Sequence, residues 1–475
     1  MKKYILIILC CLTSFPLWSY NVNMIVEHYS VDQGLPNNTV NCTLKDRDGF
    51  IWFGTWYGLC CFDGVKFKTF NKQEHDSDVP PRKIQRIVED KNGYIWVKTI
   101  DRKLYVFNKV TECFHAVYDD MKNYSENIQV IKLQNTAEGD VLLLTKDKNL
   151  LLAGVDEKGQ VTIKILFDSR DEINKHDYTL KHHVLCETEE YISWIGTDYK
   201  VSAVHKGAEL ASRPADFITS KINSGDKDSF TSFFEDGRKV WVGDRAGIFY
   251  SIDVRTGLVN RYVLSEIKGA ISNLLVTPAG YVYLSVAGQG TYEYDLAERR
   301  LQKINTEMND AMVTHAFIDQ YDKIWFHENE KALIYYDPLN HTAKRFPFTM
   351  FGKITTLYSE DAGERGLFFL SPAGEAWLFD REHAEMVYIN KLKQLSNDRA
   401  NQQFYHLMLD NDGVLWLSSA DEGVYCMNFP KKQFNLLSLS PQSAGRENYA
   451  TGVRALFQSK SGDIWVGTRW QSVYR

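Results

Sequence analysis

Short runs of alternating apolar and polar residues, each closed by a turn signal, continue from Val22 to the end of the chain. Alternation with a period of two is typical of β-strands that bury one face, and clusters of Gly, Asp and Asn between such runs are typical of tight turns. Helical periodicity, with apolar residues three and four positions apart, is nearly absent. The pattern predicts an all-β protein built from many short strands.

One phrase recurs along the chain: a turn containing Gly, a β-branched or apolar residue, and then a large aromatic residue. Its clearest copies end at Trp52, Trp96, Tyr283, Trp416 and Trp465, looser copies end at Trp194, Trp241 and Trp325, and the most degenerate end at Leu142 and Phe369. These ten copies are spaced by 44, 46, 52, 47, 42, 42, 44, 47 and 49 residues. WD-type propeller blades repeat every ~40 to 45 residues, so the spacing predicts tandem β-propeller blades.

The first repeat divides into four short strands, over residues 39–44, 50–54, 59–62 and 66–70, which we call a, b, c and d in chain order. Asp and Gly residues separate them, and both residue types suit tight turns for conformational reasons. Each repeat is therefore expected to form one four-stranded blade.

The aromatic residue of strand b admits two interpretations. A row of Trp side chains could stack on sugars or bases, whereas an aromatic residue at one fixed phase in every blade is most simply a wedge between neighbouring blades. We favour the structural role for the whole set, which comprises Trp52, Trp96, Trp194, Trp241, Tyr283, Trp325, Trp416 and Trp465.

The first predicted strand has no blade of its own. Glu27 to Ser30 aligns with strand d of later repeats, such as Asn260 to Val263, so it must complete another blade. Because propellers typically have ~4 to 8 blades, we expect a seven-bladed ring over residues 24–345 and three blades of an incomplete second ring over residues 346–475. The alternative is a single ten-bladed ring, in which this strand supplies the strand d that the tenth repeat lacks.

The first 19 residues have the layout of a secretory signal peptide: Lys2 and Lys3, an apolar run from Tyr4 to Leu12, and a short segment with Pro16 that ends near Ser19. The apolar run is shorter than the roughly 20 residues that span a bilayer. We therefore expect residues 1–19 to direct export and to be removed.

Charge and composition exclude several kinds of site. A net charge of -6 gives no basic face for DNA or RNA, so no nucleic-acid partner is expected. His176, His182 and His183 lie close together, but no further ligands follow at a recognisable spacing, and neither a metal nor a cofactor is predicted. The cysteines after the signal segment lack the regular spacing of a disulfide scaffold.

A more specific motif lies in the first repeat. It runs from Tyr29 to Val40 as YSVDQGLPNNTV, continues from Asp48 to Thr55 as DGFIWFGT, and ends with Gly58 and Leu59. This motif resembles the two-component regulator propeller repeat, which is known from the periplasmic sensor regions of hybrid two-component systems in Bacteroidetes-type bacteria. The resemblance extends over nearly all of the chain after the signal segment.

In that family, two seven-bladed propellers precede a β-sandwich domain, a transmembrane helix, a histidine kinase, a receiver and a DNA-binding domain. The sequence stops at Arg475 within the tenth repeat, so we expect a truncated sensor region that is not itself an enzyme and reaches the membrane only through later parts. The resemblance implies a periplasmic chain that binds glycan-derived oligosaccharides and controls polysaccharide-utilisation genes. It also implies a homodimer.

Two other function classes remain open. Propeller faces are common docking surfaces, so one alternative is a scaffold that binds another protein. The second alternative is a propeller glycosidase, which needs two positioned carboxylates. The 61 acidic residues single out no such pair, and Arg47 stands where a sialidase Asp-box would place its Asp.

Ligand-binding residues are expected on one face of the propeller. The b–c and d–a turns share a face, so the residues just after strand b surround its mouth, and aromatic and charged side chains gather there. This mixture suits sugar recognition, although ordinary polar turns are the alternative. The candidates are Trp56, Tyr57, Arg102, Tyr199, Arg245 and Gln289, of which Arg102 and Arg245 favour an anionic or sulfated ligand.

Overall fold

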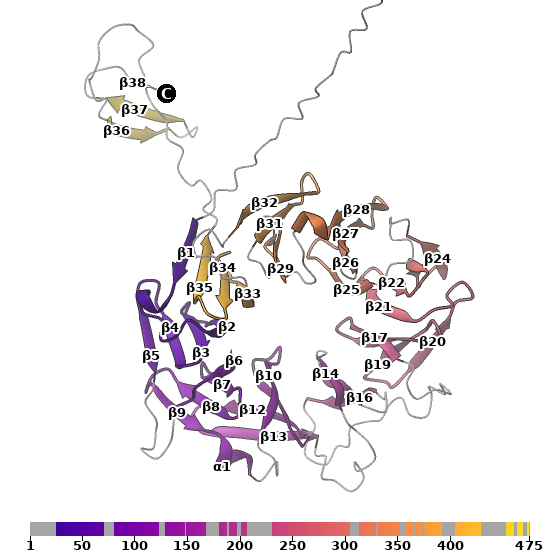
Figure 1. The fold of residues 1–475 in the computed structure, drawn as a ribbon, viewed down its shortest axis with the longest axis horizontal. Coiled ribbons are helices and arrows are strands. Elements are labelled where there is room, and N and C mark those ends of the chain that lie inside the picture. The colour runs from indigo at the N-terminus through magenta and orange to yellow at the C-terminus, as the bar shows by residue number, and fades with distance from the viewer. Residues whose placement is uncertain are drawn as a thin grey trace, which may run out of the picture. The chain divides into compact units, whose positions relative to one another are not determined.

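The computed structural model describes residues 25–70, 80–122, 129–147, 149–167, 180–187, 190–196, 201–206, 230–304, 313–328, 331–351, 358–363, 366–371, 375–391, 404–428, 453–459, 463–468 and 473–474. The chain divides into two compact units, Met1–Phe429 and Pro430–Arg475, which we call the large unit and the small unit. The described residues form nine antiparallel sheets in the large unit and one in the small unit (Figure 1). The all-β propeller architecture expected from the repeats is confirmed.

Each sheet of the large unit corresponds to one repeat. The first three sheets contain β2 (Val40–Lys45), β3 (Ile51–Thr55), β4 (Gly58–Phe62) and β5 (Phe67–Phe70); β6 (Ile84–Glu89), β7 (Ile95–Thr99), β8 (Leu104–Asn108) and β9 (Cys113–Ala116); and β10 (Val130–Asn135), β11 (Val141–Thr145), β12 (Leu150–Val155) and β13 (Val161–Phe167). The next three contain β14 (Leu180–Glu187), β15 (Tyr191–Gly196) and β16 (Val201–His205); β17 (Phe230–Glu235), β18 (Lys239–Asp244), β19 (Ile248–Asp253) and β20 (Val259–Val263); and β21 (Ile271–Val276), β22 (Tyr281–Val286), β23 (Gly290–Asp295) and β24 (Arg300–Lys303).

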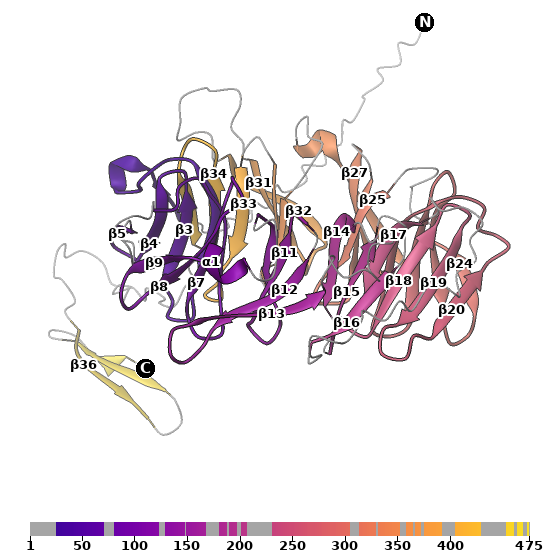
Figure 2. The ribbon, with the colours of Figure 1, turned by 90° about the horizontal axis from the view of Figure 1, so that it is seen from below.

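The seventh and eighth sheets contain β25 (Val313–Ile318), β26 (Ile324–Glu328), β27 (Ala332–Asp337) and β28 (Thr342–Pro347); and β29 (Tyr358–Asp361), β30 (Leu367–Leu370), β31 (Glu375–Asp380) and β32 (Glu385–Lys391). The ninth sheet joins β33 (Phe404–Leu409), β34 (Leu415–Ser419) and β35 (Val424–Asn428) to β1 (Ile25–Tyr29), and the small unit contains β36 (Val453–Gln458), β37 (Ile464–Thr468) and β38 (Val473–Tyr474). Seen from the side, strands of one sheet such as β17, β18 and β19 run next to each other (Figure 2).

A buried aspartate organises the turn between strands a and b. In the first sheet, Asp46 Oδ1 accepts hydrogen bonds from the backbone N–H groups of Asp48 and Phe50, at 3.0 and 2.9 Å, while Oδ2 accepts the indole N–H of Trp52 at 2.8 Å. The same Asp–Trp hydrogen bond recurs in the second, fifth, seventh and ninth sheets, through Asp90, Asp236, Asp319 and Asp410. One carboxylate therefore fixes both the turn and the ring.

The wedge interpretation of the strand b aromatics agrees with their burial in the large unit. At most 5% of the surface is exposed for Trp52, Trp96, Trp241, Tyr283, Trp325 and Trp416. The side chain of Trp194 lies outside the described residues. Trp465 differs, because 38% of it is exposed in the small unit, whose described strands form a single sheet.

Apolar clusters join every pair of successive sheets in the large unit. Each cluster takes side chains from two neighbouring sheets, as where Trp325 of the seventh sheet packs with Phe369 and Phe379 of the eighth. Eight such clusters connect the first sheet to the ninth in order. A further cluster packs Trp416 of the ninth sheet against Phe53 of the first, and so closes the ring.

The N-terminal strand is a strand d, as expected, but it completes the ninth repeat. β1 pairs antiparallel with β35, from Ile25 opposite Asn428 to Tyr29 opposite Val424. The structure therefore differs from both expected closures. No boundary lies near residue 345, because the cluster around Trp325 continues into the eighth sheet, and the division falls after Phe429 instead of between 24–345 and 346–475. The single ten-bladed ring is not formed either, because β1 completes the ninth repeat and the tenth repeat belongs to the small unit.

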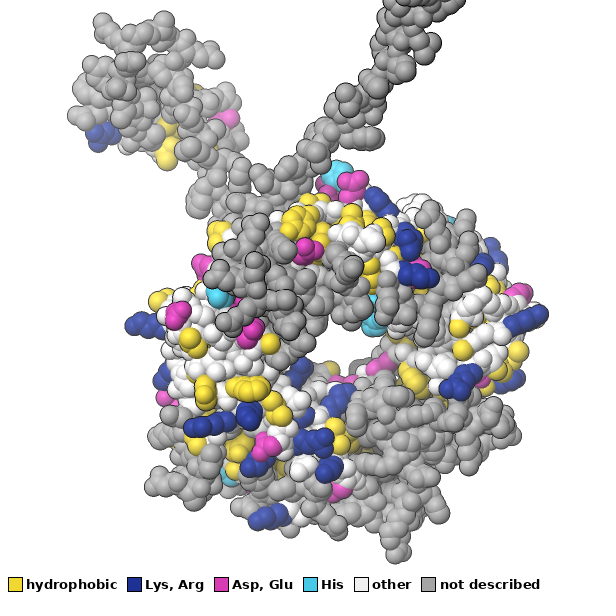
Figure 3. Space-filling view, in the orientation of Figure 1, with side chains coloured by type: hydrophobic (Ala, Val, Ile, Leu, Met, Phe, Trp, Pro, Cys, Tyr) yellow, Lys and Arg dark blue, Asp and Glu magenta, His cyan; other side chains and the backbone are white. Residues whose placement is uncertain are grey.

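Strand a lies at the inner edge of its sheet. Contacts between neighbouring sheets join these a strands, including β2 with β6, β6 with β10, β17 with β21 and β33 with β2. These strands lie around the centre of the ring (Figure 1), where the space-filling view shows an opening (Figure 3). Seven of the nine carry a register shift one residue after the strand start, beside Val40, Ile84, Val130, Phe230, Ile271, Val313 and Phe404. Such β-bulges bend a strand and redirect a side chain.

No helix among the described residues is long and apolar enough to cross a membrane. The expected signal segment, residues 1–19, lies outside the described part of the chain. Export therefore stays a prediction.

Candidate groove between the sixth and seventh sheets

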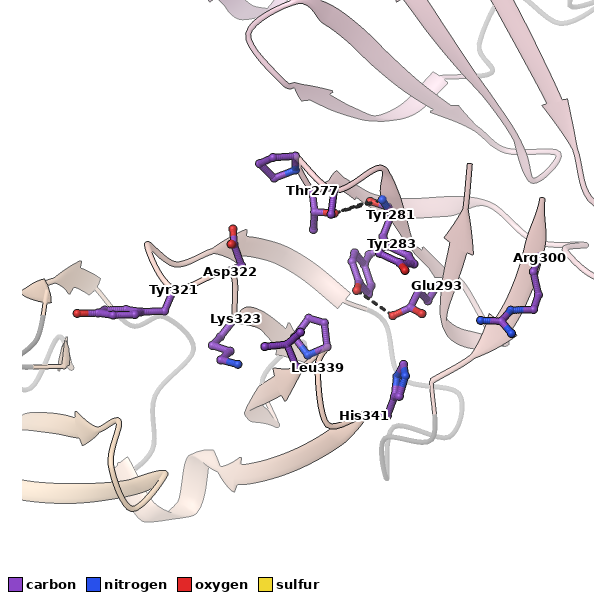
Figure 4. A pocket seen from close by; sticks show the side chains of 13 residues that line it. Thr277, Tyr281, Tyr283, Glu293, Arg300, Tyr321, Asp322, Lys323, Leu339 and His341 are labelled. Atoms are coloured by element: carbon purple, nitrogen blue, oxygen red, sulfur yellow. Dashed lines mark hydrogen bonds between the residues drawn. The ribbon is translucent and has the colours of Figure 1, made fainter. Parts of the chain in front are cut away.

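A groove of about 370 Å³ lies between the sixth and seventh sheets (Figure 4). Its size falls in the range of ~300 to 1,000 Å³ that is common for small-ligand sites. The a–b turns of both sheets and the c–d turn of the seventh sheet supply most of its walls. The lining residues are Thr277, Pro278, Ala279, Tyr281, Tyr283, Glu293, Arg300, Tyr321, Asp322, Lys323, Pro338, Leu339 and His341.

Local hydrogen bonds hold these turns in place. Thr277 Oγ1 accepts the backbone N–H of Tyr281 at 3.2 Å, and the Thr277 N–H donates to the Tyr281 carbonyl at 2.9 Å. In the seventh sheet, Asp319 Oδ1 accepts the backbone N–H groups of Tyr321 and Lys323 at 2.9 and 3.0 Å. The walls are therefore preformed by short-range contacts.

A buried carboxylate lies at the base of the groove. Glu293 is 6% exposed and accepts hydrogen bonds from the hydroxyls of Tyr283, at 2.8 Å, and Tyr336, at 3.4 Å. Tyr336 is also 3.1 Å from His341 Nδ1. Burial, followed by the charge and hydrogen bond of Glu293, raises the pKa of both tyrosines far above the ordinary value, so their hydroxyls stay protonated and donate to Glu293.

The rim combines charge with apolar surface. Arg300 and Asp322 are exposed, Lys323 Nζ lies 2.6 Å from Asp337 Oδ1, and Leu339 is 84% exposed. The ring of Tyr321 points away from Glu293 (Figure 4). The guanidinium carbon of Arg381 lies 4.4 Å from the centre of that ring. Tyr281 and Leu339 therefore supply the apolar surface of the groove, and Arg300, Asp322 and His341 supply its polar groups.

The sequence contains a signal for this groove that the repeat analysis missed. In other sheets the turn aspartate accepts the hydrogen bond of the wedge aromatic, and the residue opposite that aromatic on strand c is Cys61, Val106, Ser251, Tyr335 or Cys426. In the sixth repeat Thr277 replaces the aspartate, Tyr283 replaces the tryptophan, and Glu293 lies opposite Tyr283. The sixth repeat therefore has its buried acid on strand c instead of in the a–b turn, and this acid lines the groove.

The structure places the predicted b–c turn residues elsewhere than the groove. Trp56 and Tyr57 are 43% and 62% exposed, and Lys83 Nζ lies 5.5 Å from the centre of the Trp56 ring. Arg102 and Arg245 are exposed on turns of the second and fifth sheets, and Tyr199 lies outside the described residues.

Gln289 has a structural role in the sixth sheet. Its Oε1 accepts the backbone N–H of Lys268 at 2.7 Å, and its Nε2 donates to the carbonyl of Glu266 at 3.1 Å. These bonds tie the b–c turn to the loop that precedes β21. The amide is thus already bonded to the backbone, which leaves it less suited to a ligand than the other candidates.

One group of acids in the described residues has the spacing of a metal site, namely Asp46, Asp48 and Glu89. Lys109 Nζ lies among them, at 3.1, 2.6 and 2.8 Å from their oxygens. The lysine ammonium thus offsets part of the negative charge of the cluster and links the first sheet to the second. His176 and the side chains of His182 and His183 lie outside the described part of the chain.

Comparison with solved structures gives matches of low identity. The extracellular domain of the one component system BT4673 from B. thetaiotaomicron is 14% identical, with 83% of this chain and 65% of that chain covered and a TM-score of 0.36. The extracellular domain of the hybrid two component system BT3049 from B. thetaiotaomicron is 18% identical, with 94% and 58% covered and a TM-score of 0.31. The chain thus spans less than two thirds of either domain.

Virginiamycin B lyase from Staphylococcus aureus is 9% identical, with 85% of this chain and 99% of that chain covered and a TM-score of 0.31. A comparison with curated proteins gave no significant match. The profile of the family described as "Two component regulator propeller" matches residues 34–57, which lie within the motif quoted from the first repeat. The chain therefore carries a two-component regulator propeller repeat at residues 34–57, and the resemblance recognised in the first repeat is confirmed there.

Proposed function

We propose that the chain is the extracytoplasmic ligand-sensing region of a hybrid two-component regulator, and that it binds a glycan-derived oligosaccharide between the sixth and seventh sheets. The family match at residues 34–57 supports the regulatory role. The groove, with its preformed walls and buried Glu293, supports the binding role. Kinase, receiver and DNA-binding functions belong to other parts of such a regulator, so this chain contributes recognition to the phosphorelay and no catalysis.

The lining of the groove matches the chemistry of a sugar. Pyranose rings present an apolar face to flat or aliphatic side chains and direct their hydroxyls to fixed polar groups. Tyr281 and Leu339 offer the apolar surface, and Arg300, Asp322 and His341 offer donors and acceptors from three separate turns or strands. Polar groups held by separate elements define a direction for each hydroxyl, which favours one oligosaccharide over its isomers.

The binding experiment is a thermal-shift screen of the purified chain against a panel of glycan fragments, followed by calorimetry on any fragment that raises the melting temperature. A ligand at a hundredfold excess over Kd adds about 2.7 kcal/mol to the free energy of unfolding. We expect Arg300→Ala to weaken binding by about tenfold, because a hydrogen bond from a charged group contributes ~1.5 kcal/mol and ~1.4 kcal/mol corresponds to a tenfold change in Kd. Arg299→Ala is the matched control, since Arg299 is an exposed neighbour that does not line the groove.

The same titration compares the two candidate sites. Trp56→Ala and Arg245→Ala test the b–c turns, and an effect of these variants without an effect of Arg300→Ala would move the ligand to that face. Recovery of the unaltered fragment after incubation is expected of a sensor, whereas cleavage would establish the glycosidase alternative. A panel without any binder, together with a captured protein partner of defined stoichiometry, would favour the scaffold.

A further inference from the structure

One row of side chains on strands a and b is rich in basic groups. It consists of the residue just after the bulge in strand a and the residue opposite it in strand b. In the seven sheets where this row is described, the pairs are Cys42 and Gly54, Arg86 and Lys98, Lys132 and Leu144, Ser232 and Gly243, Asn273 and Ser285, His315 and His327, and His406 and Ser418. Four of these pairs contain Lys, Arg or His, and none of the seven contains an acid.

Lys98 is the unusual member of the row. Its position holds glycine in the first and fifth sheets, where an added Cβ would approach Ile84 Cγ2 to 2.6 Å and Ile271 Cγ2 to 2.7 Å. In the second sheet a lysine occupies this tight position and is 6% exposed. Its Nζ donates to the carbonyl of Ile131 in the next sheet. The ammonium group has three donors, and this is the one hydrogen bond that it makes within the described residues.

The two charged groups that shift the pKa of Lys98 have the same sign, and the acid on the adjoining turn, Asp101, pairs with Lys103. Arg86 lies opposite it in the ladder and is exposed, and Arg102 lies on the turn that follows the same strand. Burial, Arg102 and Arg86, in that order, lower the pKa of Lys98 to about 8. None of the three makes an ion pair with an acid in the described part of the chain. A buried charge without a counter-charge is costly, so an anion placed beside these groups would be bound favourably.

A polar atom without a partner lies near the same group of cations. His406 Nδ1 of the ninth sheet is buried and has no hydrogen-bond partner among the described residues. Burial, followed by the charge of Arg86, lowers the pKa of His406 to about 4. Asp244 and Glu328 end strand b in the fifth and seventh sheets, where Asp244 accepts backbone N–H groups and Glu328 pairs with Arg345. Neither acid belongs to the second sheet.

We propose that the central opening binds the anionic group of a ligand, a carboxylate or a sulfate, between Lys98, Arg86 and Arg102. The opening is visible in the space-filling view, with Lys and Arg side chains on part of its rim (Figure 3). Charge-assisted hydrogen bonds from guanidinium and ammonium groups to an oxyanion are among the strongest in proteins. This site is separate from the groove between the sixth and seventh sheets and does not depend on the function proposed for that groove.

The test measures the melting temperature and the calorimetric Kd of the chain with sodium sulfate and with sodium chloride at equal ionic strength. Sulfate stabilises folded proteins in general because it is excluded from their surfaces, so the site is tested by the part of the stabilisation that is lost when its cations are replaced. Lys98→Met and Arg86→Gln should each weaken sulfate binding by tenfold or more. Lys158→Met, which removes an exposed lysine from a c–d turn of the third sheet, should leave it within twofold.

Two results would overturn the site: the same gain from sulfate over chloride in the wild type, Lys98→Met and Arg86→Gln, or equal loss of sulfate binding in all three variants, which indicates general charge screening. Arg86 is exposed, so Arg86→Gln still decides the matter if Lys98→Met does not fold. Competition by glucuronate, with glucose as the neutral control, distinguishes the source of the anion. Displacement of sulfate identifies a site that accepts an acidic sugar, and sulfate binding alone identifies an inorganic oxyanion site.

Discussion

A single residue, Asp90, fixes two parts of the second sheet. Its carboxylate holds both the a–b turn and the ring of Trp96. It is 1% exposed and accepts the N–H groups of Asn92, Tyr94 and the Trp96 indole at 2.9, 3.0 and 2.9 Å. A buried donor left unpaired costs ~1–3 kcal/mol. We expect Asp90→Ala to lower the free energy of unfolding by about 3 kcal/mol, measured by urea denaturation.

The control for this variant is Asp63→Ala. Asp63 also accepts two backbone N–H groups, from Val65 and Lys66, but it is exposed, so water can replace its oxygen. Its loss should cost less than about 1 kcal/mol, because exposed turn bonds contribute little. If both variants lost the same free energy of unfolding, the indole hydrogen bond and the burial of Asp90 would not contribute to stability.

Gly54 shows how closely neighbouring sheets approach. An added Cβ would lie 2.4 Å from Cys42 Sγ and 2.6 Å from Ile84 Cγ2, which is too near for either atom. Overpacking of this kind costs ~1–3 kcal/mol, so Gly54→Ala should lower the free energy of unfolding by about that amount. Gly154→Ala provides the comparison, because its nearest neighbours would lie at 3.6 and 3.8 Å, and denaturation should find it close to the wild type.

The lowered pKa of Lys98 predicts how stability depends on pH. The folded chain releases this proton near pH 8, whereas the unfolded chain keeps it up to about 10.5. Between these values the unfolded state holds more protons, so the contribution of Lys98 to the free energy of unfolding rises with pH. The stability advantage of Lys98→Met over the wild type should therefore be largest below pH 8 and shrink toward pH 10.5. A difference that stays constant from pH 7 to pH 10 in urea denaturation would contradict this.

Among the strands, β1 is expected to matter most for the stability of the large unit, because it joins the first and ninth sheets of the described ring. Tyr29 of this strand packs against Phe62 and Phe67 of the first sheet, at ring distances of 5.0 and 5.4 Å, and belongs to the cluster that closes the ring. Aromatic residues in cores lose ~3–5 kcal/mol on truncation to Ala. Tyr29→Ala should fall near the lower end of that range, because its side chain is only partly buried.

Removal of Ile25–Tyr29 should destabilise the large unit further, and a synthetic IVEHY peptide should restore part of the loss. Differential scanning calorimetry measures both effects. Val31→Ala, just after the strand, is the control, because Val31 is 48% exposed and outside the β1–β35 ladder. An unaltered melting temperature in the deletion variant would mean that the ring does not depend on this strand.

At the scale of the whole molecule, the repeat period predicted the blades, and Trp96 and its counterparts took the wedge position that a fixed phase implies. The strand with which β1 pairs, and so the closure of the ring, could not be derived from the repeat period. The alignment of Glu27 with later d strands shows that it is a strand d, but every strand c offers a similar edge. The choice of β35 depends on side chains that meet only after folding, such as Tyr29 with Trp416 at a ring distance of 6.5 Å.

The candidate site illustrates the same limit. The b–c turns predicted Trp56 and Tyr57 as ligand-binding residues, and both side chains are exposed in the structure. Glu293 was not predicted, because an acid within a strand looks ordinary in the sequence. Its partners Tyr283 and Tyr336 come from two different sheets, which only the structure reveals. Lys98 was missed for a similar reason, since its burial depends on a neighbouring sheet.

The pairing of β1 with β35 also sets an order of events during synthesis. Ile25 leaves the ribosome early, while Asn428 follows after about 400 residues, or ~20–80 s at translation rates of ~5–20 residues per second. During that interval the face of the first sheet that contains Phe53 lacks its partner, because the ninth sheet has not been synthesised. An apolar face therefore stays uncovered at the N-terminal end of the nascent chain for most of synthesis, and a chaperone that holds unfolded chains would protect it there.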